Sequence, residues 1–478
     1  MSAAVQTKLP IYHNAIDWPA FQRDYPVPDV FQETVYKWPR DRVHDLQNTR
    51  LKEVLEVGWQ NGFYRKRWSE AGLKPSDVKG LDDLPKLPTF NSDDIKDDQQ
   101  EHPPFGHIQG VTTDDLATTP LKIQTSGGTT GKPRATLYGP IDWEMNGLTA
   151  GRAFYAQGLR PGDVMQIPAT CSLANLGWCA YKGAHDYLGV LPLTTGSGVV
   201  TPSRRQLEIA FDWGTNAWLS FPEYMTQLAH VCRTELNRDP RDLKTKMITT
   251  FLGPDTEDLL RNQIQDIFGC PVYDNYGTNE IGSGAFECQE QSGLHFMEDC
   301  MIFEIIDVES GEPVAPGEKG NLVVTHLARR VPPIIRFDLR DLSRIVGKDT
   351  CGCGSSFRRM DHFLGRSDDM VKLRGVNMYP MACLGAVKSD ERTTGEWICI
   401  AERHERKGVI RDEMTVRVET RDDAGSLDGL TDHLERRLQN DLGVKVAVEL
   451  VPAGSLAEAA NLGREGKAKR LIDRRFEK

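Results

Sequence analysis

The amino-acid sequence predicts an α/β protein with a large N-terminal body of mixed β-sheets and helices and a small C-terminal α+β domain. The chain has 478 residues. This is too long for a single ordinary hydrophobic core, so at least two domains are expected. Short β-rich runs alternate with helical stretches through the first three quarters of the chain, which is typical of an α/β body. The pattern then changes to a shorter α+β unit. We therefore expect a large domain over residues 1–364 and a small domain over residues 365–478.

The large domain is expected to begin with a helical segment, over about residues 31–98. Apolar residues recur there close to i, i+3, i+4 spacing before Pro and Asp interrupt the pattern. Short strands and helices are then predicted to alternate. The predicted strands are Ala135–Tyr138, Val164–Pro168, Lys246–Leu252 and Asn321–Thr325, and the predicted helices are Trp143–Gln157 and Thr256–Phe268.

The small domain is expected to contain one helix between two strands. The helix is predicted at Leu427–Asp441, and the strands at Met414–Glu419 and Val444–Val451. No internal repeat or low-complexity segment is detected.

The composition excludes two classes of partner. The formal net charge is −11, whereas binding to a nucleic-acid backbone is driven by clusters of Lys and Arg. No apolar run approaches the roughly 18 residues that a membrane span needs. The first ten residues lack the pattern of a secretory signal, so a cytoplasmic location is expected. The ten Cys residues are too sparse for a disulfide-stapled domain and are expected to be reduced thiols.

A glycine-rich stretch, Thr125–Arg134, is the strongest candidate for binding phosphates. It combines hydroxyls, flexible glycines and cations in ten residues. Glycines let backbone N–H groups approach an anion, hydroxyls donate hydrogen bonds, and Lys132 neutralises charge. It is not a Walker A loop, because Ser126 stands where that motif has its first glycine and Pro133 stands where it has Ser or Thr.

Two further motifs offer groups that could hold the rest of a nucleotide. Tyr273–Glu280 is predicted to be a strand end that turns at Gly277, and it presents an aromatic ring and a carboxylate. An aromatic ring can stack on adenine, and a carboxylate can hold Mg²⁺. In Arg336–Leu342, Asp341 could accept hydrogen bonds from both ribose hydroxyls. Each motif alone would also be compatible with an ordinary turn or a surface salt-bridge cluster.

Together with the charged stretches Gly365–Asn377 and Gly466–Arg470, these motifs occur in the order that they have in a known superfamily. The chain resembles the adenylate-forming enzymes: acyl-CoA synthetases, adenylation domains and luciferases. The segment Leu73–Lys96 and the sequence Gly365–Met370 look most like the phenylacetate-CoA ligase and coenzyme F390 synthetase branch. The resemblance covers nearly the whole chain from about Asn48.

The resemblance implies a role for each matching residue. The β- and γ-phosphates of ATP would be bound by Thr125, Ser126, Gly127, Gly128, Thr129, Thr130 and Lys132. Tyr276 would face adenine, and the adjacent Gly277 would also belong to the nucleotide site. Glu280 would bind Mg²⁺, and Asp341 and Arg366 would hold ribose. The residue before Glu280 is usually Thr or Ser in the family, so here the α-phosphate hydrogen bond would come from Asn279 or Thr278.

The resemblance also implies that the small domain is mobile. Asp368 would be its hinge, and Lys467 the catalytic lysine that bridges the substrate carboxylate and the α-phosphate. The expected activity is ATP-dependent formation of an acyl-adenylate with release of pyrophosphate, followed by transfer of the acyl group to coenzyme A. An aryl or small organic acid is the expected substrate.

A possible structural Zn²⁺ site consists of three thiols and one imidazole. Cys351 and Cys353 follow the Asp341 motif, whereas Cys288 and His295 lie upstream of it. This ligand set suits structural Zn²⁺, and some members of the branch carry a comparable cluster. The alternative is a set of reduced thiols with a surface histidine, because the sequence does not show that the two halves meet.

The acyl pocket and the acceptor stay open. The segment Cys171–Leu176 is small and polar where phenylacetate ligases place aromatic pocket residues, which argues against phenylacetate itself. Trp178, Tyr181 and Phe221 could line a pocket or belong to the ordinary core. An amine or a carrier-protein thiol is the alternative acceptor to coenzyme A, and a purely nucleotide-binding module is a third hypothesis. A homodimer is also left open.

Overall fold

The computed structural model describes residues 9–126, 134–255, 257–347, 350–373, 376–406, 409–460 and 469–475. The chain forms two compact units. The first unit comprises Met1–Phe251, Ile264–Leu339 and Arg344–Asp361, and the second comprises Leu252–Gln263, Arg340–Ser343 and His362–Lys478. The second unit therefore includes two short segments that precede residue 364, and the predicted boundary at that residue stays a prediction.

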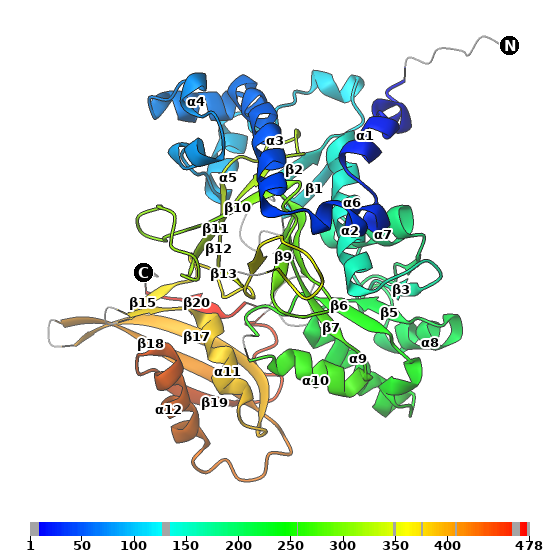
Figure 1. The fold of residues 1–478 in the computed structure, drawn as a ribbon. Coiled ribbons are helices and arrows are strands. Elements are labelled where there is room, and N and C mark those ends of the chain that lie inside the picture. Colours follow the sequence, from blue (N-terminus) through cyan, green and yellow to red (C-terminus); the bar gives the residue numbers. More distant parts are fainter. Residues whose placement is uncertain are drawn as a thin grey trace. The chain divides into compact units, whose positions relative to one another are not determined.

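A nine-stranded mixed sheet is the centre of the first unit (Figure 1). Its order is β13 (Ile345–Val346), β14 (Arg359–Met360), β9 (Leu294–Phe296), β8 (Gly282–Glu287), β7 (Val272–Thr278), β6 (Met247–Thr250), β5 (Ala217–Leu219), β3 (Val164–Gln166) and β4 (Leu191–Leu193). The strands from β7 to β4 are parallel, and those from β7 to β13 are antiparallel. The predicted α/β fold class is confirmed.

Helices connect the parallel strands, as parallel pairing requires. They are α7 (Asn175–Leu188), α8 (Ser203–Trp213), α9 (Pro222–Glu235) and α10 (Leu259–Phe268). The helix α6 (Pro140–Gln157) precedes β3, and its side chains Ala150 and Phe154 meet those of α7 and of strands β3, β5 and β6 in one buried apolar cluster. This core also includes Tyr273 near the start of β7 (Val272–Thr278), so β7 enters the sheet next to α6 and α7.

The N-terminal helices include the predicted helical segment. They are α1 (Trp18–Asp24), α2 (Pro28–Glu33), α3 (Arg40–Gln60), α4 (Gly62–Glu70) and α5 (Ser92–Glu101). In α3, Val43, Leu51, Val54 and Leu55 are buried, in accordance with the apolar spacing in the sequence. Among the described residues, no helix has the length and apolar character that crossing a bilayer requires.

Two smaller sheets contain further strands of the first unit. β1 (Lys122–Ser126) and β2 (Arg134–Tyr138) form an antiparallel hairpin, in which Ser126 is opposite Arg134. β10 (Met301–Ile306), β11 (Gly320–His326) and β12 (Phe337–Ser343) form a three-stranded sheet. The strand β12 continues from the first unit into the second.

The second unit contains a four-stranded sheet in the order β19, β18, β17, β20. These strands are β19 (Ala447–Pro452), β18 (Val409–Thr420), β17 (Thr393–Arg406) and β20 (Leu471–Asp473), with the hairpin β15 (Val371–Leu373) and β16 (Val376–Met378) and the helices α11 (Leu384–Lys388) and α12 (Leu430–Leu442). In α12, Leu430, Leu434, Leu438 and Leu442 are buried at i, i+4 spacing. This apolar row explains the helix that the sequence predicts.

One predicted turn is displaced. The strand β7 does not turn at Gly277 but continues to Thr278, with an irregularity in its pairing to β8 between Tyr276 and Gly277. A Cβ atom on Gly277 would lie 2.3 Å from the carbonyl oxygen of Gly282. Glycine is therefore required here because two backbones approach closely, and the turn itself lies beyond Thr278.

Candidate functional site

The glycine-rich stretch begins at the end of β1 and finishes at the start of β2. Thr125 and Ser126 are the last residues of β1, and the N–H of Thr125 donates to the carbonyl of Leu173 over 2.7 Å. Arg134 opens β2. Gly127, Gly128, Thr129, Thr130 and Lys132, the remaining predicted phosphate-binding residues, lie outside the described residues.

The predicted adenine and Mg²⁺ residues lie at the carboxyl end of β7, where open parallel sheets hold their ligands. Tyr276 is 6% exposed and Glu280 is 4% exposed. Two side chains hold the backbone of this turn. The hydroxyl of Tyr138 donates to the carbonyl of Asn279, and the guanidinium of Arg329 donates to the carbonyl of Glu280. The turn is therefore anchored independently of the Glu280 side chain.

The carboxylate of Glu280 is paired with Arg134. The Nε of Arg134 donates to Oε1 of Glu280 over 3.1 Å, and one terminal guanidinium nitrogen donates to the same oxygen. Burial raises the pKa of Glu280, but the charge and hydrogen bonds of Arg134 outweigh it, so the pKa lies below its ordinary value. Glu280 is consequently ionised at neutral pH. This contact joins two motifs that lie 146 positions apart in the sequence.

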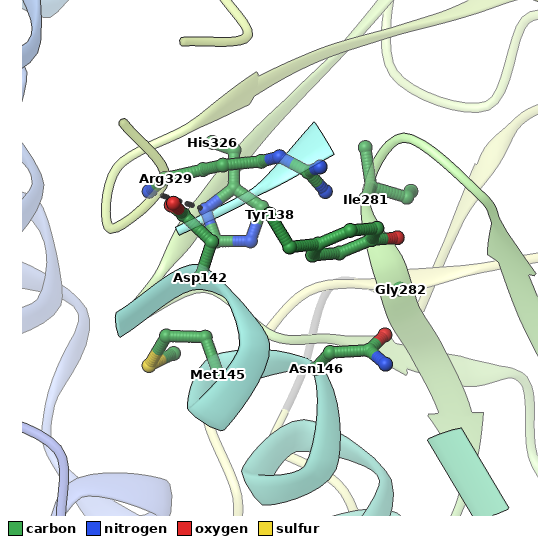
Figure 2. Close-up of a pocket in the computed structure, with 8 residues that line it drawn as sticks. All are labelled: Tyr138, Asp142, Met145, Asn146, Ile281, Gly282, His326 and Arg329. Carbon is green, nitrogen blue, oxygen red and sulfur yellow. Dashed lines mark hydrogen bonds between the residues drawn. The ribbon is translucent and has the colours of Figure 1, made fainter. Parts of the chain in front are cut away.

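A small polar pocket lies behind this turn (Figure 2). Its lining residues are Tyr138, Asp142, Met145, Asn146, Ile281, Gly282, His326 and Arg329. The guanidinium of Arg329 lies 4.0 Å from the centre of the Tyr138 ring, and its Nη2 donates to the carbonyl of Leu137 over 2.8 Å. These side chains leave little free space between them, and Tyr138 and Arg329 hold the turn from this side.

Two ionisable groups in this pocket have shifted pKa values. Burial, together with the charges of Arg329 and Arg330, lowers the pKa of His326 well below its ordinary value. Its Nδ1 accepts hydrogen bonds from the N–H groups of Ala328 and Arg329, both at 3.2 Å. Burial raises the pKa of Asp142 to about 6 against the opposing charge of Arg329. The histidine is thus neutral in the folded protein.

The predicted ribose and hinge residues meet in the second unit. Nη1 of Arg366 lies 3.0 Å from Oδ1 of Asp341, while its Nε and Nη2 both lie 2.8 Å from the two carboxylate oxygens of Asp368. Burial lowers the pKa of Arg366, but the two carboxylates raise it by more. The net result is a pKa above the ordinary value. One guanidinium therefore links both carboxylates. Lys467 lies outside the described residues.

The four predicted zinc ligands come together in the first unit and are called the Cys288 cluster. Their ligand atoms all lie within 4.8 Å of one another. Cys288 Sγ lies 3.7 Å from Cys351 Sγ, and Cys353 Sγ lies 3.6 Å from Nε2 of His295. A tetrahedral Zn²⁺ with ordinary bond lengths separates two sulfurs by about 3.8 Å and a sulfur from a nitrogen by about 3.6 Å. The cluster therefore fits the ion.

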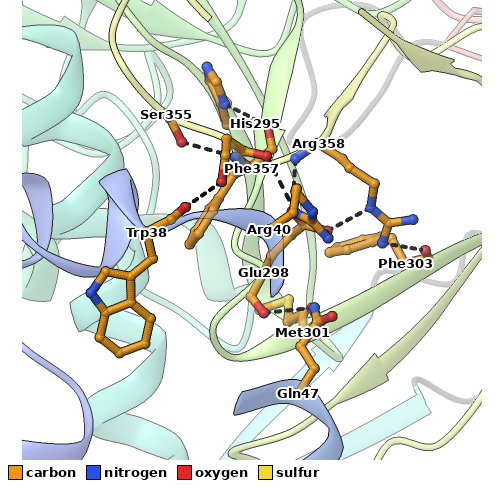
Figure 3. Close-up of polar contacts among 11 residues, drawn as sticks. Trp38, Arg40, Gln47, His295, Glu298, Met301, Phe303, Ser355, Phe357 and Arg358 are labelled. Carbon is orange, nitrogen blue, oxygen red and sulfur yellow. Dashed lines mark hydrogen bonds and ion pairs between the residues drawn. The ribbon is translucent and has the colours of Figure 1, made fainter. Parts of the chain in front are cut away.

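Neighbouring groups orient the imidazole of the Cys288 cluster and lower the pKa of one of its thiols. Nδ1 of His295 lies 3.3 Å from the carbonyl of Phe357, which can only accept, so Nδ1 carries the hydrogen and Nε2 presents its lone pair (Figure 3). The hydroxyl of Tyr36 lies 3.5 Å from Cys353 Sγ. Hydrogen bonds from Cys288, His295 and Tyr36 lower the pKa of Cys353 despite burial. A cavity of about 190 Å³ borders Cys288 and Cys353.

Two supporting residues of this cluster were not predicted from the sequence. Tyr36 is separated from Cys353 by 317 positions, and no motif marks it. Glu298 is fully buried and forms ion pairs with Arg40 and Arg358, which follows Phe357 directly (Figure 3). The charges of these arginines lower the pKa of Glu298 against its burial. A buried, doubly paired carboxylate is visible only in three dimensions.

A second group of ligand-type side chains, the Asp98 cluster, contains Asp98, His102 and His107. The two imidazole rings are stacked, with centroids 3.6 Å apart and planes 22° from parallel. Asp98 accepts from the N–H of Ile108 over 2.8 Å and lies 3.1 Å from Nδ1 of His102. Asp98 therefore shapes the loop that follows α5.

The candidate pocket aromatics are half-buried. Nε1 of Trp178 donates to the carbonyl of Ser172 over 2.8 Å, and the Tyr181 ring is stacked on His185. Phe221 lies at the start of α9, 6.0 Å from the Phe251 ring. None of the three lines the small pocket behind Glu280 or belongs to the buried cluster of α6 and α7.

Comparison with known proteins identifies the family. Residues 375–475 match the family described as AMP-binding enzyme C-terminal domain. The phenylacetate-coenzyme A ligase of Pseudomonas putida is 31% identical over 91% of this chain and 94% of its own length. The corresponding ligase of Thermus thermophilus is 28% identical over 93% of this chain and its own full length.

Solved structures extend this likeness to three dimensions. A 2-hydroxyisobutyryl-CoA ligase in the postadenylation state, in complex with 2-HIB-AMP, is 28% identical, matches with a TM-score of 0.81, and covers 92% of this chain and 91% of its own. The same ligase with 2-HIB-AMP and CoA in the thioesterification state matches with a TM-score of 0.66. The chain thus belongs to the adenylate-forming enzymes, in the branch of the phenylacetate-coenzyme A ligases.

Proposed function

We propose that the protein is an AMP-forming acid–thiol ligase that activates a carboxylic acid with ATP and transfers the acyl group to coenzyme A. The observation that carries this proposal is the contact between Arg134 and Glu280. It brings Arg134, the last residue of the glycine-rich stretch, onto the ionised carboxylate that follows β7. A phosphate-binding loop and a metal-binding carboxylate must be adjacent in a site that cleaves ATP.

The first half-reaction makes an acyl-adenylate. A carboxylate oxygen attacks the α-phosphorus of ATP, a new P–O bond forms, and the bond to the β-phosphate breaks with release of pyrophosphate. We assign the β- and γ-phosphates to the segment from Thr125 to Lys132, adenine to Tyr276, and ribose to Asp341 and Arg366. Lys467 bridges the substrate carboxylate and the α-phosphate. These residues act by positioning and by neutralising charge.

The second half-reaction forms the thioester. The thiolate of coenzyme A attacks the acyl carbon, and AMP leaves with the shared oxygen. We assign the hinge between the two half-reactions to Asp368, whose carboxylate is held by Arg366. The proposed small domain, residues 365–478, is the part that moves. Its mobility lets one site use Lys467 first and a thiol later.

Mg²⁺ is the proposed metal of the nucleotide. Glu280 fits it, because its carboxylate is ionised and buried, and Mg²⁺ is commonly held by one or two carboxylates together with substrate phosphates. When bound, the ion would neutralise phosphate charge. A structural Zn²⁺ is proposed for the Cys288 cluster, where its role is to hold the β13–β14 region against β9.

The acid is proposed to be an aryl or small organic acid. The segment Cys171–Leu176 lies beside the start of the glycine-rich loop, as the bond from Thr125 to Leu173 demonstrates. None of its side chains is aromatic, and Cys171, Ser172, Ala174 and Asn175 are small or polar, which favours an acid other than phenylacetate. The related 2-hydroxyisobutyryl-CoA ligase, with its small hydroxy acid, agrees with this choice.

A pyrophosphate-release screen across aryl and short-chain acids, with and without coenzyme A, tests the function. At least one acid should release pyrophosphate, and mass spectrometry should find the acyl-CoA only when coenzyme A is present. Accumulation of the acyl-adenylate with no effect of coenzyme A would instead support an amine or a carrier-protein thiol as acceptor. Absence of pyrophosphate release with every acid would contradict the ligase assignment.

The role of Lys467 is tested by separating the two half-reactions. Lys467→Ala should lose adenylate formation by at least ~10²-fold, since a positioned charge at the reacting phosphate is removed. It should retain thioester formation from supplied acyl-adenylate. Lys469→Ala, at an exposed position two residues on, is the matched control. Equal loss of both half-reactions in Lys467→Ala would refute the hinge mechanism.

A further inference from the structure

The Arg134–Glu280 pair poses a problem for metal binding at the proposed site. Both contacts from the guanidinium end on Oε1 of Glu280, and the side chains of Arg134 and Glu280 are only 12% and 5% exposed. A divalent cation at the same carboxylate would lie a few ångströms from the guanidinium. Two cations at that separation repel strongly in a desolvated site. The guanidinium therefore opposes metal binding at this carboxylate.

The surroundings of Glu280 allow an exchange of one cation for the other without moving the turn. Arg329 and Tyr138 bind the backbone carbonyls of Glu280 and Asn279, so the main chain stays anchored when the side chain changes its partner. Arg134, in contrast, is attached at the end of the glycine-rich loop, where the phosphates of a nucleotide are proposed to bind. A guanidinium is well suited to phosphate oxygens because it can donate two parallel hydrogen bonds.

We propose that Arg134 is an exchangeable counter-ion: it holds the Glu280 carboxylate in the nucleotide-free protein and releases it to the metal when a nucleoside triphosphate arrives. The freed guanidinium then neutralises phosphate charge. The metal site is thereby open only when the nucleotide is present, so Mg²⁺ and ATP bind together. This inference rests on the proposed role of Glu280 as a metal ligand.

Removing the charge of Arg134 tests the exchange by metal binding alone. Mn²⁺ serves as the probe for Mg²⁺, since both prefer oxygen ligands, and free Mn²⁺ is quantified by electron paramagnetic resonance. Without nucleotide, the wild-type protein should bind Mn²⁺ weakly, whereas Arg134→Gln should bind it at least ~10-fold more tightly. With Mn²⁺ saturating, Arg134→Gln should bind a non-hydrolysable ATP analogue about 10-fold more weakly by calorimetry, because a phosphate contact is lost.

Three variants separate this outcome from others. Arg134→Lys keeps the positive charge and should retain the weak Mn²⁺ binding of the wild type. Arg344→Gln removes a guanidinium that is paired with Asp361 elsewhere in the same unit and should change neither measurement. If Arg134→Gln unfolds, the double variant Arg134→Gln with Glu280→Gln should recover the melting temperature, because no uncompensated buried carboxylate remains.

Nucleotide-free Mn²⁺ affinity that is equal in folded Arg134→Gln and in the wild type would overturn the exchange. Failure of the metal assignment is recognised differently: Glu280→Gln would then bind Mn²⁺ with the ATP analogue as tightly as the wild type. Failure of the ligase function is distinct from both, because an absence of pyrophosphate release with every acid leaves the Mn²⁺ measurements unaffected.

Discussion

The Cys288 cluster and the Asp98 cluster both gather ligand-type side chains within 4.8 Å, but they differ in the direction of their lone pairs. In the Cys288 cluster, the separations match the edges of a tetrahedron around Zn²⁺, and Phe357 orients the imidazole of His295. In the Asp98 cluster, the planes of the stacked rings are nearly parallel, so their in-plane lone pairs do not converge on one point. Proximity thus does not make a metal site unless the donor directions agree.

The largest expected effect comes from removing thiolates of the Cys288 cluster. Cys351→Ser with Cys353→Ser should lose one equivalent of zinc, and the melting temperature should fall by roughly 3–8 °C, since a metal that binds only the folded state stabilises it. Elemental analysis and calorimetry measure both. Cys171→Ser, a thiol outside the cluster, is the matched control and should change neither. If the purified wild-type protein contained no zinc, the Cys288 cluster would, like the Asp98 cluster, not be a metal site.

A smaller effect is expected from the hydroxyl next to Cys353. Tyr36→Phe keeps the buried ring but removes the group 3.5 Å from Cys353 Sγ, so zinc affinity should fall about 10-fold. Competition with a chromophoric chelator measures the change. Tyr64→Phe, which removes a buried hydroxyl bound to the carbonyl of Pro333, should leave zinc affinity unaltered. Equal affinity in wild type and Tyr36→Phe would show that the hydroxyl does not tune the thiolate.

A pH experiment tests how the neighbours of a buried histidine determine the direction of its pKa shift. Thiol hydrogen bonds raise the pKa of His295 against its burial, whereas the equally buried His326 faces arginines and has a lowered pKa. The unfolded chain therefore binds a proton at His326 below about pH 6.5 that the folded protein does not, and stability is lost as the pH falls from there. The slope is at most about 1.4 kcal/mol per pH unit.

Denaturant unfolding between pH 7.5 and 5 checks this prediction. The wild type should lose stability more steeply than His326→Gln, and the difference between the two slopes isolates the histidine from Asp142, whose raised pKa of about 6 acts in the opposite direction. Parallel slopes for wild type and His326→Gln would contradict the neutral, buried histidine.

The smallest effect is expected at the Asp98 cluster. His102→Ala and His107→Ala should leave the zinc content unchanged and alter the free energy of unfolding by less than about 1 kcal/mol, because His102 is only half-buried and His107 is exposed. Calorimetric titration with Zn²⁺ tests the same point. If the wild type bound a second equivalent of zinc tightly and His102→Ala did not, the Asp98 cluster would be a metal site after all.

Several features were predictable from local sequence because local physics determines them. The i, i+4 leucines specify α12, and the apolar spacing specifies α3. The motif from Tyr273 to Glu280 marks the end of a buried strand, although its turn was predicted two residues too early. That error arose because Gly277 serves a close approach of two backbones, which a turn signal does not distinguish.

By itself, the sequence determined the fold class, the order of the nucleotide motifs and the identity of the candidate zinc ligands. The tertiary structure decided which of them meet. His295 and the Cys351–Cys353 segment are adjacent because β14 pairs with β9, with Arg359 opposite His295. Arg134 reaches Glu280 because the β1–β2 hairpin lies beside the end of β7. Such contacts depend on strand register and packing between segments far apart in the chain, which local propensity does not encode.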